Sequence, residues 1–473
     1  MDTLAERRRL VDVQDTEITH STTAGRPDRA EPRPASATDD HQLLLLDAES
    51  VPKLRDETAR LIDQDWGSSY GGLDNLAATL QGRLKDRAVR AGVVAASADQ
   101  ARERLAQLAV ALNRDGQLGE AIHDVGNGVF AGRAGGKPTI GFLFPGQGAD
   151  VNAATSALTR RFETARDLYR TVTIPTAEDS TGLGANGQRI VASSIAGLRV
   201  LSMLGIEASM AAGHSLGELT ALHWAGAMRE STLLALVNAH GQIMAKACDG
   251  RGSMATISTR PEDVEPLLRG EPVAVAGYNT PTQTVVAGPA DAVARVLQTA
   301  AATGLRTAEL PVREAFHTPA MAPAMDGLRA HLEGMRFRTL ERTVQSTVTG
   351  DALPPDANLH DLLVRQLCEP VRFSQAVGHM ADEADLIVEV GPDQLLSRLA
   401  VHICPGVPVV PLATDSTSSS GLLCAAAAAY VLGAPVRHEH LVWPRSGSTP
   451  RENANPRAET DGANPHSPGT RRA

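Results

Sequence analysis

A serine within a glycine-bracketed turn is the residue of this sequence best suited to chemistry. Ser215 lies in Gly213-His-Ser-Leu-Gly217, a G-x-S-x-G pattern that follows an apolar run and precedes a helix-like run. A serine hydroxyl attacks a carbonyl only when a base removes its proton, and a sharp strand-to-helix turn lifts its oxygen clear of the backbone. The turn would also point the N–H of Leu216 at a developing oxyanion. The pattern predicts a nucleophile elbow, although it also occurs by chance in loops.

The best candidate for the base is His317, one of 14 histidines. It lies in Ala315-Phe-His-Thr-Pro319, where an inserted segment, 253–316, returns the chain to the main body. Binding and catalytic sites often form at such junctions. A lone histidine before Thr-Pro is by itself more typical of a turn, so the assignment depends on its pairing with Ser215. We expect this pair to act as nucleophile and base.

Strand-like and helix-like runs alternate around these residues, which predicts an α/β fold. Apolar runs at 139–144, 210–213 and 386–390 predict strands, and apolar residues at three- and four-residue spacing predict helices. The main-body helices are expected at 189–204, 231–247, 323–332, 360–364 and 422–432. Within 253–316 the order β-α-β-β-α-β resembles a ferredoxin-like unit.

The N-terminal part predicts an α/β module of its own, with strands at 41–48 and 88–95 and helices around them. A glycine-rich connection, 126–136, follows it. Both ends of the chain are polar and aperiodic, which predicts disorder. The expected organisation is a disordered 1–40, an α/β module at 41–137, an α/β-hydrolase-like large subdomain with a parallel sheet at 138–252 and 317–412, a ferredoxin-like small subdomain at 253–316, a helical extension at 413–444 and a disordered tail at 445–473.

Composition and patterning exclude several classes of function. A formal net charge of -10 without a basic stripe argues against nucleic-acid binding. The four cysteines are widely spaced without a C-x-x-C pair, and no metal site is expected. No apolar run reaches about 18 residues and no signal-peptide pattern is present, so we expect a cytoplasmic protein without a membrane span. Gly182-Leu-Gly-Ala-Asn-Gly187 fits the dinucleotide fingerprint, but the polar 177–181 before it cannot be the buried strand that this site needs.

Four landmarks together resemble one family. Phe144-Pro-Gly-Gln-Gly148, Gly213-His-Ser-Leu-Gly-Glu218, Ala315-Phe-His-Thr-Pro319 and Glu389-Val-Gly-Pro392 are similar to the acyltransferases of fatty acid and polyketide synthesis, the malonyl-CoA:ACP transacylase-like family. That family moves acyl groups between coenzyme A and acyl carrier proteins. The resemblance covers about residues 138–410. The module at 41–137 resembles the linker that precedes acyltransferase domains in modular polyketide synthases, and a free-standing transferase is expected.

The resemblance implies a role for each landmark. Ser215 would be acylated, and His317 would act as base and then as acid. The N–H groups of Gln147 and Leu216 would form the oxyanion hole, and a backbone carbonyl close to Asp393 would orient the histidine.

The resemblance also implies partners and substrates. Arg306, Asn279 and Gln283 would contact the pantetheine or the carrier, although these side chains also suit a solvated surface or turn caps. No cofactor would be permanently bound. Acyl-CoA or acyl-phosphopantetheine would be the substrate, and an acyl carrier protein would be the partner.

One position departs from the malonyl-handling members, which carry an arginine that grips the free carboxylate. Here that position, 25 residues after Ser215, is His240. A buried charge that loses its partner costs roughly 3–5 kcal/mol, and neutral histidine offers no dependable charge. We therefore expect an acyl group without a free carboxylate: a monoacyl, an aminoacyl or peptidyl, or a starter unit. Leu216 and Phe316 would also influence selectivity, and Phe316 resembles the malonyl-type members.

Three other functions remain open at this point. The acyl-enzyme could be resolved by water, which would make the chain an acyl-carrier hydrolase. A protonated His240 could still accept malonyl, which would make it a malonyl-specific trans-acting acyltransferase. An inactive docking module is disfavoured, because the serine, the histidine and the oxyanion turn are all present.

Overall fold

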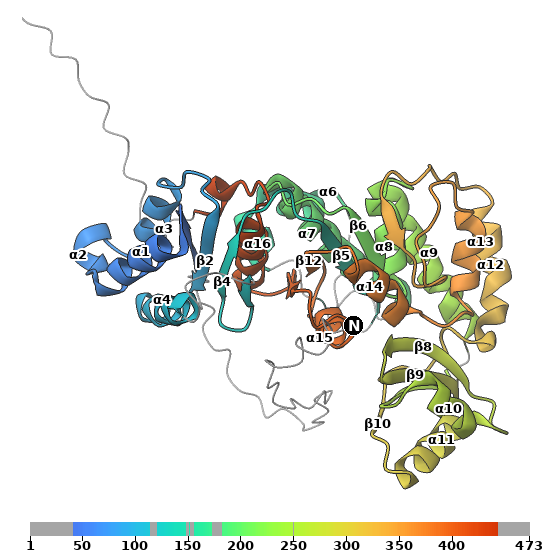
Figure 1. The fold of residues 1–473 in the computed structure, drawn as a ribbon. Coiled ribbons are helices and arrows are strands. Elements are labelled where there is room, and N and C mark those ends of the chain that lie inside the picture. The colour runs from blue at the N-terminus through green and yellow to red at the C-terminus, as the bar shows by residue number, and fades with distance from the viewer. Residues whose placement is uncertain are drawn as a thin grey trace, which may run out of the picture. The chain divides into compact units, whose positions relative to one another are not determined.

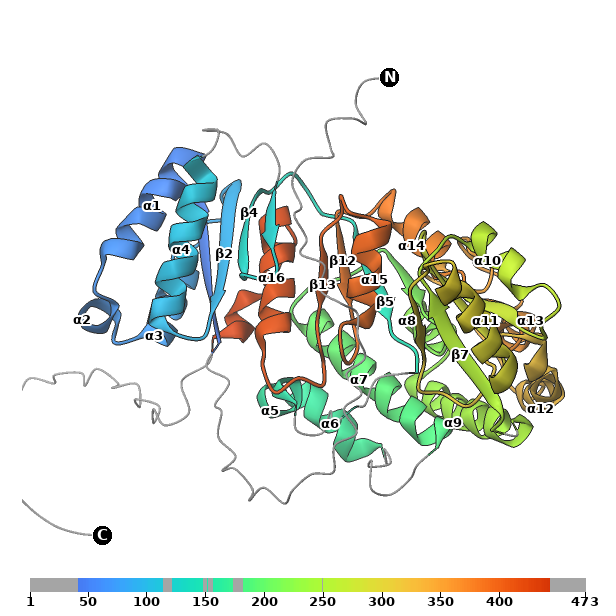
Figure 2. The same cartoon turned by 90° about the horizontal axis from the view of Figure 1, so that it is seen from below.

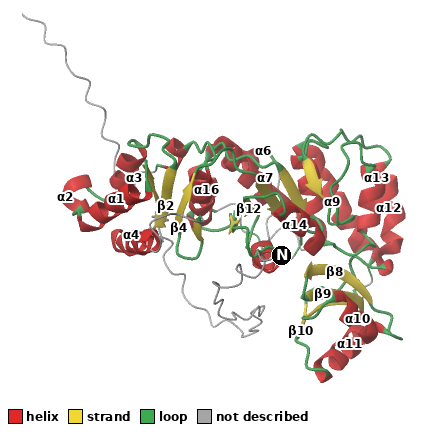
Figure 3. Ribbon diagram, in the orientation of Figure 1, coloured by secondary structure: helices red, strands yellow, loops and turns green. Residues whose placement is uncertain are grey.

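The computed structural model describes residues 41–113, 121–147, 151, 156–172, 182–248 and 250–442. The segments 1–40 and 445–473, which are predicted to be disordered, and the polar segment 177–181 lie outside the described residues. Strands and helices alternate along the described chain (Figure 3), which confirms the predicted α/β class.

The main body is built on a five-stranded parallel sheet with the strand order β11-β6-β5-β12-β13. Its strands are β5 (Ile140–Phe144), β6 (Met210–Gly213), β11 (Thr343–Gln345), β12 (Leu386–Glu389) and β13 (Val409–Pro411). Parallel strands that are covered on both faces read as continuous apolar runs, so β5, β6 and β12 are recognisable in the sequence. The outer strands β11 and β13 have three residues each, too few for such a run.

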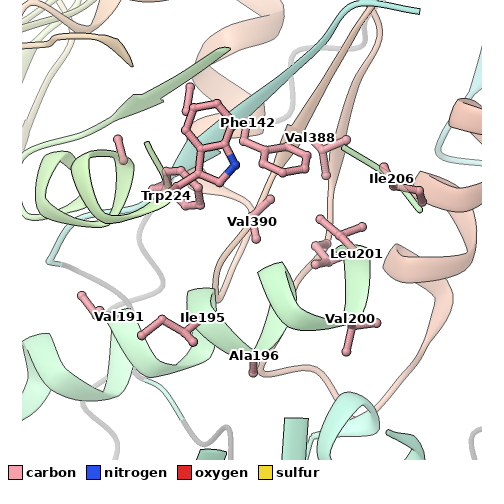
Figure 4. Close-up of a cluster of buried hydrophobic side chains, with 14 of the residues drawn as sticks. Phe142, Val191, Ile195, Ala196, Val200, Leu201, Ile206, Trp224, Val388 and Val390 are labelled. Carbon is pink, nitrogen blue, oxygen red and sulfur yellow. The ribbon is translucent and has the colours of Figure 1, made fainter. Parts of the chain in front are cut away.

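Helices cover both faces of this sheet, because successive residues of each strand point to opposite sides. Phe142 and Val388 pack with side chains of α7 in one apolar cluster (Figure 4). Leu143 and Ile387 belong to a second cluster with Phe373 on the other face. The main-body helices are α5 (Ala157–Arg161), α6 (Glu163–Thr171), α7 (Leu183–Met203), α8 (Gly217–Trp224), α9 (Glu230–Ala247), η3 (Pro319–Met321), α12 (Ala322–Leu332), α13 (Leu359–Gln366), α14 (Phe373–Ala381), α15 (Leu395–Ile403), α16 (Ser420–Leu432) and η4 (His438–Leu441).

The helix predicted to begin at 189 begins six residues earlier, at Leu183. Its first turns are formed by the glycine pattern 182–187, which lies before the predicted start of the helix. These glycines let α7 approach α9 closely, since a Cβ on Gly184 would lie 2.8 Å from the backbone oxygen of Asn238. Close helix packing therefore explains this pattern.

Residues 252–309 form a second, antiparallel sheet with the order β10-β7-β9-β8. Its elements are β7 (Gly252–Ile257), α10 (Pro261–Leu268), β8 (Ala274–Thr280), β9 (Gln283–Pro289), α11 (Ala290–Ala302) and β10 (Thr307–Glu309). Both helices pack on one face of the sheet (Figure 1). This is the ferredoxin-like order that the sequence predicts, although β10 ends at Glu309 and not at 312.

The N-terminal module is a four-stranded antiparallel sheet with the order β1-β2-β4-β3. It consists of β1 (Gln42–Ala48), α1 (Val51–Asp63), α2 (Trp66–Tyr70), α3 (Leu73–Gln81), β2 (Val89–Ala95), α4 (Ala98–Asn113), β3 (Ile122–Asp124) and β4 (Val129–Arg133). The prediction of a glycine-rich connection at 126–136 is therefore wrong, because β4 lies within it. Phe130 and Ala131 are fully buried, as expected for a central strand.

Helix α16 joins this module to the main body. It is buried from Leu422 to Val431 and packs against β2 and β4 on one side and β13 on the other (Figure 2). A Cβ on Gly132 would lie 2.8 Å from the oxygen of Val431, so the glycine in β4 admits the helix backbone. A helix that is apolar on all faces is stable only when it is enclosed, and the two sheets enclose α16.

Candidate active site

Ser215 lies between the end of β6 and the start of α8, at φ 53°. The left-handed region costs a non-glycine residue about 1–3 kcal/mol, and such strain concentrates at functional sites. The flanking glycines make the turn possible: a Cβ on Gly213 would lie 2.1 Å from the carbonyl carbon of Gly217, and one on Gly217 would lie 2.0 Å from Phe144 O. The turn has the geometry of the predicted elbow.

His317 is the partner of the serine. Ser215 Oγ and His317 Nε2 are 2.7 Å apart, and His317 Nδ1 is 2.9 Å from the backbone oxygen of Gln366. A carbonyl only accepts, so Nδ1 carries the proton and Nε2 accepts from the serine hydroxyl. Burial lowers the pKa of His317 to about 4, which keeps the ring neutral and able to take a proton near pH 7.

Gln366, at the end of α13, holds both members of this pair. Its backbone oxygen accepts from His317, and its side-chain Nε2 donates to the backbone oxygen of Ser215 at 2.8 Å. The expectation that a carbonyl close to Asp393 orients the histidine is therefore wrong. The Asp393 backbone N–H donates to Asp415, and its carboxylate accepts from Gln394 N and Arg398.

The turns that carry Gln147 and Leu216 are in contact, because a Cβ on Gly146 would lie 2.4 Å from His214 O. Gln147 is fixed by its side chain, which donates to the backbone oxygen of Leu183 at 3.2 Å. Within the described segments, the backbone N–H groups of Gln147 and Leu216 have no acceptor. Both are therefore available to an oxyanion.

The ferredoxin-like unit reaches the elbow through a short polar chain. His214 Nε2 donates to Asn279 Oδ1 at 3.2 Å, and Asn279 Nδ2 donates to Gln283 Oε1 at 3.0 Å. The structure thus brings Asn279 and Gln283 to the site. Arg306 is exposed, and its backbone oxygen accepts from Ser258 N. It lies two strands from Gln283 across the sheet, roughly 10 Å away.

His240 lies on the buried face of α9 and is 6% exposed. Neither of its ring nitrogens has a hydrogen-bond partner in the described chain. Burial, with a smaller contribution from His317, lowers the pKa of His240 to about 4. Phe316 packs against the main core and against a small apolar cluster of the ferredoxin-like sheet that includes Met254 and Val285, so it lies at their junction.

Glu218 and Thr347 hold the elbow through hydrogen bonds, and neither was predicted to have a role. The backbone N–H of Thr347 donates to Glu218 Oε2 at 3.1 Å, and Thr347 Oγ1 donates to Gly213 O at 2.7 Å. Glu218 is 0% exposed, and burial raises its pKa to about 7. Glu218 is part of the quoted motif, whereas nothing in the sequence distinguishes Thr347 or Gln366.

A strand–turn–helix serine, a histidine that accepts its proton and two free N–H groups are the parts of an acyl-transfer site. With a parallel sheet and an inserted ferredoxin-like unit, they define an acyltransferase.

Among the helices that the structure describes, none has both the length and the apolar composition needed to span a membrane.

Comparison with known proteins agrees. The model of the family "Acyl transferase domain" matches residues 188–405. The malonyl CoA-acyl carrier protein transacylase of Bacillus subtilis is 32% identical over 288 residues, which are 56% of this chain and 90% of that protein. The chain belongs to this acyltransferase family, as its motifs predict.

Polyketide synthases are also similar. Polyketide synthase GfsA of Streptomyces halstedii is 31% identical over 376 residues, 71% of this chain but only 5% of that protein. A crystal structure of the acyltransferase domain of the iterative polyketide synthase in enediyne biosynthesis is 33% identical, with a TM-score of 0.70. The match covers 84% of this chain and 97% of that domain, so it extends well beyond residues 188–405.

Proposed function

We propose that this chain transfers an acyl group through an ester on Ser215 to the phosphopantetheine thiol of an acyl carrier protein. The observation that carries the proposal is the 2.7 Å contact between Ser215 Oγ and His317 Nε2, together with the carbonyl that holds the proton on Nδ1. The polyketide synthase and carrier-protein transacylase relatives support the carrier as acceptor. The donor is an acyl-CoA or a second acyl carrier.

The reaction has two balanced halves. His317 takes the proton of Ser215 as Oγ attacks the donor thioester, the C–S bond breaks, and His317 gives the proton to the leaving thiolate. In the second half His317 takes the proton of the acceptor thiol, the thiolate attacks the ester, and Ser215 recovers its proton as the C–O bond breaks. In both halves the N–H groups of Gln147 and Leu216 stabilise the tetrahedral oxyanion. Arg306, Asn279 and Gln283 guide the pantetheine arm.

The acyl group has no free carboxylate. A carboxylate at His240 would face a neutral, buried ring, and an unpaired buried charge costs roughly 3–5 kcal/mol. Relatives named malonyl transacylases argue against this part of the proposal, so every panel of donors should include malonyl-CoA.

Mass measurement of the intact protein after incubation with a panel of acyl-CoA donors tests the proposal. We expect acyl adducts on the wild type and none on Ser215→Ala. Transfer predicts that the acyl group then moves to a carrier protein, whereas release of free acid without an acceptor would identify a hydrolase. Malonyl labelling as strong as that by any uncharged donor would refute the exclusion of carboxylates.

A further inference from the structure

His240 is an exception among the described histidines, because both of its ring nitrogens are buried and without a partner. His214, His223, His317 and His360 each have a hydrogen bond to the protein. A neutral imidazole carries one donor and one acceptor, and leaving such groups unpaired in a protein interior destabilises the fold. A group outside the protein chain that pairs with His240 would remove this cost.

The position of His240 on α9 indicates where that group would lie. Val237, one helical turn earlier on α9, and Leu216, next to the nucleophile, both approach Gly187: a Cβ there would lie 3.0 Å from Val237 Cγ1 and 3.1 Å from Leu216 Cδ2. Residues three apart share a helix face, so His240 continues the surface of α9 that meets Leu216.

Two chemical classes fit this position poorly. A carboxylate would meet the His240 ring in place of a cation, and this ring is neutral above about pH 4. An alkyl chain would leave the ring donor and acceptor as unpaired as they are without it. A hydroxyl or an amide can both donate and accept, so it can pair with either ring nitrogen without burying a charge.

We propose that the acyl group carried by Ser215 bears an uncharged hydrogen-bonding group, a hydroxyl or an amide, that pairs with the His240 imidazole. This inference rests on the proposed function and narrows its substrate. It selects hydroxyacyl, aminoacyl-amide and peptidyl chains over simple alkanoyl starters. His240 is then a specificity-determining residue, and the reacting bonds are unchanged.

Four thioesters of similar size test the inference: the coenzyme A esters of malonic acid, malonamic acid, butyric acid and 3-hydroxybutyric acid. The rate constant for acyl-Ser215 formation is measured by quenched-flow mass spectrometry. In the wild type we expect the amide or the hydroxyl donor to react about 5- to 150-fold faster than butyryl, the factor that one buried hydrogen bond provides. Malonyl should be slower than malonamyl.

Two variants provide the matched comparison. His240→Leu removes both polar atoms and should bring the ratio of the polar donor to butyryl to about 1, whereas His240→Gln keeps a donor and an acceptor and should retain a preference. Equal wild-type rates for butyryl and both uncharged polar donors would overturn the inference and leave the acyltransferase intact. So would an unchanged ratio in a folded His240→Leu protein. Absence of any acyl-enzyme in the wild type would overturn the proposed function itself.

Discussion

Replacing Gln366 by leucine should slow acylation of Ser215 without changing the protonation of His317. Gln366 is 4% exposed and donates to the Ser215 backbone oxygen at 2.8 Å, so the variant removes one of the two hydrogen bonds that this oxygen accepts. The other, from Glu218 N at 3.0 Å, remains. The net contribution of one hydrogen bond is about 0.5–1.5 kcal/mol. Leucine keeps the backbone carbonyl that accepts from His317 Nδ1.

The size of the effect is limited by the one hydrogen bond that is lost. Ser215 is held at φ 53°, a conformation that costs about 1–3 kcal/mol relative to a relaxed turn, and the bond from Gln366 is one of several that hold it. Its loss removes about 0.5–1.5 kcal/mol. If the whole amount appears in the barrier, acylation slows roughly 2- to 13-fold.

The assay is the rate of acyl-Ser215 formation from about pH 5 to 8, combined with urea unfolding. We expect Gln366→Leu to lower the rate by the same factor at every pH. The matched control is Gln81→Leu, because Gln81 makes the same kind of bond to Leu43 O in the N-terminal module. The control should lose stability but keep its rate. A wild-type rate in Gln366→Leu, with stability reduced as in the control, would refute the positioning role.

The buried charges and close contacts of the site lead to three other measurements. Because burial lowers the pKa of His317 to about 4, the acylation rate should stay level from about pH 8 to 5 and fall only near pH 4; a midpoint near 6.5 would contradict the buried neutral base. In Gly217→Ala the new Cβ would lie 2.0 Å from Phe144 O and should cost at least about 1–3 kcal/mol of unfolding free energy. In the control Gly378→Ala, on α14, no atom lies within 4 Å of the new Cβ, so the unfolding free energy should rise by up to about 1 kcal/mol. Equal changes in the unfolding free energy of the two variants, measured by urea unfolding, would contradict the close contact at Gly217. Burial raises the pKa of Glu218 from 4.5 to about 7, so the folded state keeps a proton that the unfolded chain releases, and stability should decline as pH rises from about 4.5 to 7. Glu218→Gln should reduce this decline in stability. An equal or steeper decline in the variant would contradict the raised pKa of Glu218.

The side chains of the nucleophile and the base could be found from the sequence, whereas the carbonyl that orients the base could not. Ser215 and His317 stand out because few residue types act as nucleophile and base. The carbonyl that orients His317 belongs to Gln366, and every residue has a carbonyl. The family resemblance pointed to a carbonyl close to Asp393 instead, and only the position of the end of α13 in the fold decides between the two.

Packing partners distant in sequence explain the missed strand of the N-terminal module. The glycines at 126–136 are typical of a loop, yet β4 runs through them. Gly132 is needed because the backbone of α16 lies against it at Val431, and Gly92 of β2 similarly faces Ala427. These contacts join residues about three hundred positions apart, so local propensity reports a loop where tertiary packing requires a strand.

The backbone from Gln366 to Arg372 joins parts of the site that the motifs leave separate. Gln366 holds Ser215 and His317. Val371 accepts from Tyr278 N at 2.8 Å and donates to Ala276 O at 2.9 Å, which adds this stretch to the edge of β8. The Arg372 N–H donates to Thr347 O at 2.7 Å, beside the elbow. Displacing β8 from the elbow would therefore break these bonds or strain the few residues between Val371 and Gln366. The placement of the ferredoxin-like unit and the orientation of His317 are thus coupled through main-chain atoms, and the side chain of Gln366 extends this coupling to Ser215.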